Sequence, residues 1–155
     1  MSGTQHLESL FVPIKRLQPS ALFQRALNGR VLYSHVVVAE GQSLIFVSGQ
    51  LARDGSGNIV GPRDMRRQIQ QVGENLRAAL EAAGAGLADL VKTTTFVTDI
   101  DEFFRHVDIR HDILGVSLPA STTVEVRRLS HPDLMVEIEA IAMRTCASAA
   151  SGWQA

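Results

Sequence analysis

The sequence contains only one cysteine, Cys146, among its 155 residues. An internal disulfide is therefore impossible, and this cysteine usage is typical of proteins that work in a reducing compartment. Neither sign of charge dominates, because 15 Lys and Arg residues stand against 16 Asp and Glu residues. A protein that holds nucleic acid through a broadly basic surface carries an excess of Lys and Arg, so we expect no nucleic-acid partner.

Long hydrophobic runs are also missing. No apolar stretch approaches the roughly 18 residues needed to cross a bilayer. The N-terminal segment has no basic stretch followed by a long apolar run, as a signal peptide would have. With 45% hydrophobic residues, the chain can still bury a core without disulfides or metal ions. We therefore expect a soluble, cytoplasmic protein with no membrane partner.

The spacing of histidines does not fit a metal site. His106 and His111 are five residues apart, whereas two zinc ligands on one helical face are four apart. The glycine-rich segment 55–61 lacks the strand-to-helix context of a phosphate-binding loop. We expect neither a metal ion nor an organic cofactor.

Strand and helix patterns follow one another clearly after residue 30. β-branched residues crowd 31–39 and 43–49 around a glycine-containing turn, which predicts a hairpin. Apolar residues spaced by three and four predict a helix over Asp64–Ala83 that ends at Gly84. Gly73 lies inside this helix, and we expect it to allow close packing on a sheet.

The pattern continues with a strand over 90–99 and a second helix over Glu102–Leu114, capped by Asp99 or Asp101. The buried face of this helix is expected to include Phe103, Val107 and Leu114.

Two strands, Ser121–Leu129 and Leu134–Arg144, close the ordered part of the chain. The short connector between them predicts antiparallel pairing. The resulting order, β-β-α-β-α-β-β, predicts an α+β fold with helices on one face of a sheet. Residues 1–30 are expected to form an N-terminal extension with a helical turn near Ser20–Ala26, and residues 145–155 a flexible tail.

The last strand carries two carboxylates, Glu137 and Glu139, on one side of an otherwise apolar segment. In the preceding strand, Glu125 and Arg127 also share a face, and we expect it to be the same face of the sheet. A solvated face would be more uniformly polar. The mixture of acids with Met and Ile suits a face that packs against another subunit.

Several motifs together resemble the RidA family, also called YjgF/YER057c/UK114, some of whose members carry the label L-PSP endoribonuclease. They are FVSGQ at 46–50, ENLRAALEAAGAGLADLVKTTTFVTDIDEF at 74–103, the Pro119–Ala120 pair and VEIEAIA at 136–142. The resemblance spans about 31–144. It implies a chorismate-mutase-like fold, a homotrimer with clefts between subunits, and hydrolysis of reactive enamines or imines to keto acids and ammonia.

The resemblance also implies a set of cleft residues. The family glutamate that positions water corresponds to Glu137, and Ser48 and Gly49 fall where the family lines its cleft. The family arginine that grips the substrate carboxylate corresponds to Ser121. A serine hydroxyl cannot replace a guanidinium with five donors, so the resemblance is to the members that lack this arginine, which include 2-aminomuconate deaminases.

Three further positions depart from the family pattern. A family tyrosine falls on His35, an asparagine on Val107 and a cleft cysteine on Thr123. His35 either contacts substrate or is simply a satisfied polar residue of a strand. Ser121, Thr122 and Thr123 either bind a polar ligand group or serve as good strand formers.

Two questions remain open: the role of Glu137, and the identity of the cation that binds the substrate carboxylate. Glu137 either orients a water molecule or forms an ion pair with Arg127. Arg53, Arg127 and Arg128 are the candidates for the missing guanidinium. The resemblance therefore implies a homotrimer that deaminates a small carboxylate-bearing imine other than 2-aminoacrylate. The alternative is a protein of the same fold that binds or senses such a metabolite without turnover. A ribonuclease rests on the family label alone.

Overall fold

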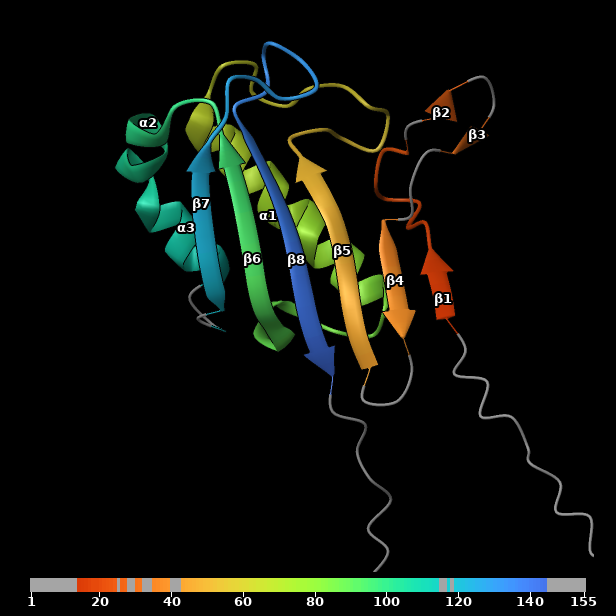
Figure 1. Ribbon diagram of the computed structural model, residues 1–155. Coiled ribbons are helices and arrows are strands. Elements are labelled where there is room, and N and C mark those ends of the chain that lie inside the picture. Colours follow the sequence, from red (N-terminus) through yellow and green to blue (C-terminus); the bar gives the residue numbers. More distant parts are fainter. Residues whose placement is uncertain are drawn as a thin grey trace, which may run out of the picture.

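The computed structural model describes residues 14–24, 26–27, 30–31, 35–39, 43–114, 117 and 119–144. A six-stranded sheet in the order β1-β4-β5-β8-β6-β7 forms one layer, and the helices pack on one of its faces (Figure 1). This confirms the expected α+β architecture. The strands are β1 (Ile14–Leu17), β4 (Val36–Ala39), β5 (Ser43–Leu51), β6 (Leu90–Val97), β7 (Ala120–Glu125) and β8 (Val136–Arg144), with a separate ladder of β2 (Ala26–Leu27) and β3 (Arg30–Val31). The helices are α1 (Met65–Ala82), the 3-10 turn η1 (Leu87–Asp89), α2 (Ile100–Arg105) and α3 (Val107–Leu114).

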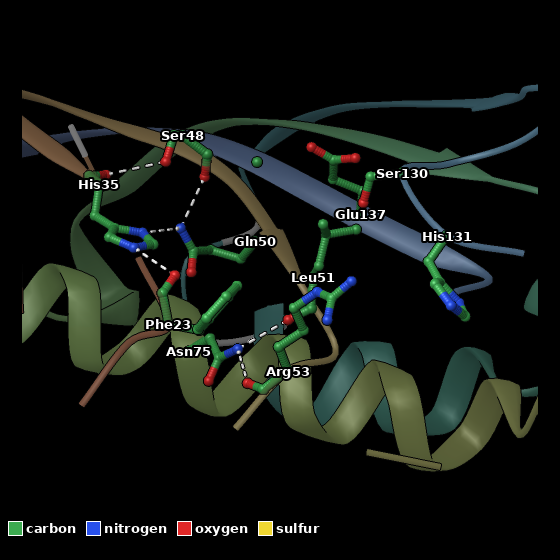
Figure 2. A pocket seen from close by; sticks show the side chains of 11 residues that line it. Phe23, His35, Ser48, Gln50, Leu51, Arg53, Asn75, Ser130, His131 and Glu137 are labelled. Atoms are coloured by element: carbon green, nitrogen blue, oxygen red, sulfur yellow. Dashed lines mark hydrogen bonds between the residues drawn. The ribbon is translucent and has the colours of Figure 1, made fainter. Parts of the chain in front are cut away.

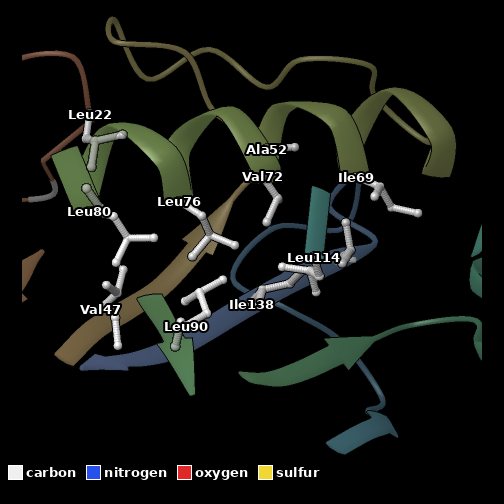
Figure 3. Close-up of a cluster of buried hydrophobic side chains, with 14 of the residues drawn as sticks. Leu22, Val47, Ala52, Ile69, Val72, Leu76, Leu80, Leu90, Leu114 and Ile138 are labelled. Atoms are coloured by element: carbon white, nitrogen blue, oxygen red, sulfur yellow. The ribbon is translucent and has the colours of Figure 1, made fainter. Parts of the chain in front are cut away.

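The long helix α1 forms as expected and carries the core. Its first turn is capped by Asp64, whose Oδ1 accepts the Arg67 N–H at 3.0 Å. Gly84, with φ +69°, ends it in the left-handed region that favours glycine. The side chains of one face point at the sheet (Figure 3): Ile69, Val72, Leu76 and Leu80 are buried against Val47 and Ile138. Each such side chain stabilises the fold by about 1.5–3 kcal/mol.

Gly73 permits a close approach, although not to the sheet. A Cβ on Gly73 would collide with the side chain of Ile113 on α3. The glycine therefore allows close packing of α1 on α3, and the expectation that it allows close packing on the sheet is wrong.

The two C-terminal strands do not pair with each other. β8 lies between β5 and β6 and is antiparallel to both, whereas β7 pairs parallel with β6. The expected antiparallel pair is wrong, because the connection between the two strands is longer than the short connector that predicted it. The connection spans residues 126–135, which lets the chain pass over β6. The segment from β6 through α2 and α3 to β7 is a crossover, which joins parallel strands.

This pairing moves Glu125 to the other side of the sheet. Glu125 lies opposite Val97, which is fully buried toward the helices. Its Oε2 accepts the N–H of Ile100 at 3.0 Å, at the start of α2. Glu137 instead lies opposite Phe96 on the open face. The expectation that Glu125 and Arg127 share a face of the sheet with Glu137 is therefore wrong, since Arg127 also lies beyond the end of β7.

The second helix is broken at His106 into α2 and α3, and Asp99 caps the first piece by accepting the Glu102 N–H at 2.8 Å. The break rotates the following turn. Ile109 is therefore buried in place of Val107, which is 48% exposed.

Part of the N-terminal segment belongs to the sheet. β1 pairs antiparallel with β4 as an edge strand, and Leu22 is buried in the core. The expected helical turn near Ser20–Ala26 reduces to one turn, closed by the Leu22 N–H and the Pro19 carbonyl at 3.0 Å. Residues 145–155, with Cys146, lie outside the described residues. None of the helices described is long and apolar enough to span a membrane.

Candidate functional site

A cleft of about 600 Å³ opens where β5 and β8 meet the loops after β5 and before β8. Figure 2 shows His35 and Gln50 at one end, His131 at the other, and Arg53 and Glu137 between them. The cleft lining consists of Phe23, His35, Ser48, Gly49, Gln50, Leu51, Arg53, Asn75, Ser130, His131 and Glu137. Four of the residues expected from the sequence, His35, Ser48, Gly49 and Glu137, are thus brought together within one chain.

A bulge in β5 shapes the cleft. Val47 pairs with Ala140 but Gln50 pairs with Ile138, so Ser48 and Gly49 interrupt the ladder. Bulges of this kind redirect side chains next to functional sites. Gly49 comes to lie against the Glu137 carboxylate, and a Cβ at this position would overlap Oε1. The bulge therefore depends on a residue without a side chain.

Glu137 is a half-buried acid without a partner in the described part of the chain. Among those residues its carboxylate makes no hydrogen bond or ion pair, with Arg127 or any other side chain, and burial and Glu139 are the influences on its pKa. Burial raises the pKa of Glu137, and the nearby charge of Glu139 raises it further. A carboxylate with a raised pKa in a cleft is a candidate for general acid–base chemistry.

His35 is held on both ring nitrogens. Its Nε2 lies 3.0 Å from the Phe23 carbonyl oxygen, and the Gln50 side-chain amide lies 3.3 Å from Nδ1. These partners assign a neutral ring with the proton on Nε2. Burial lowers the pKa of His35, and the bond to Phe23 opposes this only in part. The same Gln50 amide donates to the Ser48 carbonyl at 3.1 Å, so His35 supports the bulge.

Arg53 is the cation of this cleft. Its Nη1 donates to the Gly57 carbonyl at 2.7 Å, and its guanidinium lies 5.6 Å from the centre of the Phe23 ring. The Asn75 side-chain amide donates to the carbonyls of both Leu51 and Arg53, each at 2.9 Å, and so anchors the end of β5. Arg127 and Arg128 are not part of the cleft lining.

The other expected residues, Ser121, Thr122 and Thr123, lie on β7 and do not line this cleft. Ser121 Oγ accepts hydrogen bonds from Arg110 Nη2 at 2.7 Å and from Thr93 Oγ1 at 3.1 Å. On the other side of the strand, Lys92 Nζ donates to Thr122 Oγ1 at 3.0 Å. The expected site residues thus form two separate groups in one chain.

Sequence reasoning did not single out Gln50, Asn75 or Arg110. Gln50 ends the FVSGQ motif, which is the one signal that pointed to it. Asn75 is one of two buried polar residues, with Gln68, on the mostly apolar face of α1. Arg110 meets Ser121 across eleven residues of chain, and no periodicity marks such a contact. Among the described residues, no three of His, Cys, Asp and Glu gather as metal ligands would.

The face of the sheet opposite the helices carries several exposed apolar side chains among its polar ones. Phe46 is 44% exposed, and Leu44, Val124 and Met143 are each 39% exposed. Exposed apolar area of this kind marks interaction surfaces.

Comparison with known proteins agrees with this architecture. The family model described as Endoribonuclease L-PSP matches residues 23–144. A 2-iminobutanoate/2-iminopropanoate deaminase of Salmonella typhimurium is 39% identical over 106 residues, covering 66% of this chain and 80% of the relative. A solved Thermotoga maritima protein, 33% identical, has a TM-score of 0.75 over 85% of this chain and 98% of its own. The structure of E. coli TdcF with bound serine, 30% identical, has a TM-score of 0.72 over 84% and 99%. The chain belongs to the RidA family.

Proposed function

We propose that the protein hydrolyses a small carboxylate-bearing imine or enamine in clefts between the subunits of a homotrimer in the cytoplasm. The observation that supports this proposal most strongly is the Glu137 carboxylate, half-buried and without a described partner in a cleft. The deaminase among the relatives acts on imines of this kind. The apolar open face provides a surface for contact between subunits.

Glu137 acts as the proton carrier of the reaction. Its carboxylate accepts a proton from water while the water oxygen bonds to the C=N carbon of the protonated imine, and the π electron pair moves to nitrogen to give a carbinolamine. The protonated acid then returns that proton to nitrogen. The C–N bond breaks as the hydroxyl O–H electron pair forms the carbonyl, the hydroxyl proton passes to Glu137 and on to solvent, and ammonia and a keto acid leave. The raised pKa of Glu137 brings this proton transfer closer to neutral pH. An enamine first takes a proton on carbon to become the protonated imine.

One backbone donor at the bulge is already used and cannot meet developing charge on the substrate. The Ser48 N–H already donates to the His35 carbonyl at 3.1 Å. The Ser48 hydroxyl lies 3.5 Å from the same carbonyl, which leaves it only weakly held. We therefore assign Ser48 a side-chain contact with substrate.

Substrate choice should differ from that of a standard 2-aminoacrylate deaminase. Ser121 has one donor where a bidentate guanidinium would clamp the carboxylate. Positioning by such a clamp contributes strongly to rate, so we expect poor turnover of the three-carbon imine.

The test uses imino acids generated in place by an amino-acid oxidase, with release of keto acid as the signal. The wild-type protein should accelerate hydrolysis over the uncatalysed reaction. Glu137→Gln should lose about 10²–10⁴-fold of that rate. Glu139→Gln, on the same face of the same strand but outside the cleft lining, should stay within about threefold. Equal rates for wild type and Glu137→Gln would contradict the mechanism.

A second candidate is a metabolite-binding protein of the same fold, which the serine at position 121 favours. Small keto and imino acids would then raise the melting temperature through the cleft without any turnover. Thermal shift and product release measured on the same samples separate the two functions.

A further inference from the structure

We infer that Arg110, seated on Ser121, binds the substrate carboxylate and serves the Glu137 cleft of an adjacent subunit. The inference rests on the proposed function, because it requires a cleft shared by two chains. It assigns the cation that binds the substrate carboxylate to α3, whereas the candidates from the sequence were Arg53, Arg127 and Arg128.

The hydrogen bonds around Ser121 point its proton outward. Its oxygen accepts from Arg110 at 2.7 Å and from Thr93 at 3.1 Å. A hydroxyl has two acceptor positions and one donor. With both acceptor positions used, its own O–H remains to donate to something else. Thr93 is fully buried, so the serine oxygen is held from the core side.

The cluster is positive and rich in donors. Arg110 is half-buried and Ser121 is exposed, and no acid is paired with Arg110 among the described residues. The guanidinium uses one N–H on Ser121 and keeps four others. Lys92 bonds to Thr122 on the other side of the strand and does not belong to this cluster. A small anion such as a carboxylate fits this arrangement better than a neutral group.

One chain cannot bring this cluster to Glu137. β7 and β8 are separated by β6, which places the two strands about 10 Å apart. Ser121 pairs with buried Thr93 on the helix side, while Glu137 pairs with Phe96 on the open side. A small imino acid that touches both groups must therefore lie between two chains.

Arg53 is the rival cation, because it lies in the same cleft as Glu137. Its guanidinium is already held over Phe23 and bonded to Gly57. Arg110 instead bonds to a neutral hydroxyl that has a donor of its own to offer.

The position of the charge also indicates the substrate class. The Arg110 guanidinium lies against β7, next to a serine oxygen. An arginine side chain at position 121 would carry its charge away from the strand on three methylene groups. The guanidinium of Arg110 stays closer to β7 than that of an arginine at position 121 would. The distance from this charge to Glu137 of the adjacent subunit is therefore longer, and we infer that the substrates are imino acids with more than three carbons.

The first experiment measures kcat and KM for imino acids of three, four and six carbons, and for the methyl ester of the preferred acid. Arg110→Gln should raise KM for the acid at least tenfold and leave the ester within about threefold, so that preference for the acid is lost. Arg110→Lys should recover part of it. Arg77→Gln, an exposed arginine of α1, is the matched control, and melting temperatures establish that each variant folds.

The second experiment mixes subunits. Glu137→Gln and Arg110→Gln chains are co-expressed with different tags, and mixed oligomers are purified. If the site joins two chains of a cyclic trimer, about one site in three of each mixed trimer regains both residues, and turnover of the acid returns in proportion. Recovery supports the inference.

The remaining outcomes each decide the question. The inference is overturned if the mixed oligomers recover no turnover although both single variants are impaired. It is also overturned if Arg53→Gln loses the preference for the acid over its ester while Arg110→Gln keeps it. Either result leaves the proposed function intact. A preference for the three-carbon acid overturns the substrate class. Full activity in Glu137→Gln alone refutes the proposed function, whatever Arg110 does.

Discussion

The carboxylate of Glu137 lies against Gly49, with no room between them for a methyl group. The bulge of β5 brings the glycine there, and β8 brings the acid. The pair links the shape of the cleft to the position of its one half-buried acid.

Gly49→Ala should therefore displace the acid. The added Cβ would collide with Oε1, and we expect activity to fall at least tenfold, because small displacements of a catalytic group cost much of the rate. Gly86→Ala is the matched control, since nothing lies within 4 Å of its Cβ position. Keto-acid release measures both; an active Gly49→Ala protein would count against the placement of Glu137.

Glu137→Gln should stabilise the protein at neutral pH. Because burial raises the folded-state pKa of Glu137, the stability that this group contributes is present below its unfolded pKa and is lost as pH rises through the folded one. The neutral amide avoids that loss. Melting temperatures should favour the variant at pH 7, and the difference should vanish near pH 4. A variant less stable than wild type at pH 7 would contradict this electrostatic description.

His35 should make the protein sensitive to acid. Its folded-state pKa is lowered, chiefly by burial, so the unfolded chain binds a proton first as pH falls below about 6.5. Stability should therefore decrease from pH 7.5 to 5.5. His35→Gln should show a smaller decrease in urea midpoint over this range. If the urea midpoint decreased equally in both proteins, a group other than His35 would be responsible for the acid sensitivity.

Gln68→Leu should cost about 3 kcal/mol of stability. The fully buried Gln68 donates to the carbonyls of Gly61 and Asp133, at 2.9 and 2.6 Å, and accepts the Met135 N–H at 2.8 Å. Leucine would leave these backbone groups unpaired, at about 1–3 kcal/mol each. Gln70→Leu, on a partly exposed position of the same helix, should change urea unfolding by less than about 1 kcal/mol.

The parts of the fold that sequence patterns predict are those decided locally. α1 follows from apolar spacing and a cap, and the hairpin of β4 and β5 from two β-branched runs about a turn. The alternation in β8 also placed Glu137 on the open face. Strand pairing is different, because the alternation in β7 would fit any neighbour. Only the crossover through α2 and α3 decides that β6 is its partner, and this moved Glu125 to the helix side.

The site residues also divide into those that local motifs predict and those that only tertiary packing brings together. Ser48, Gly49 and Glu137 follow from motifs, yet nothing in a motif shows that Gly49 is required by the carboxylate beside it. His35 is held by Phe23, Gln50 and Gln18, which come from separate segments. The contact between Arg110 and Ser121 depends on how α3 packs beside β7, which is a matter of tertiary packing.

The most direct test of Glu137 as the proton carrier is the pH dependence of kcat/KM for imine hydrolysis. The rate should fall on the acid side with an apparent pKa above that of an ordinary glutamate, and this limb should disappear in Glu137→Gln along with most of the activity. An identical profile and rate for the variant would contradict the central claim.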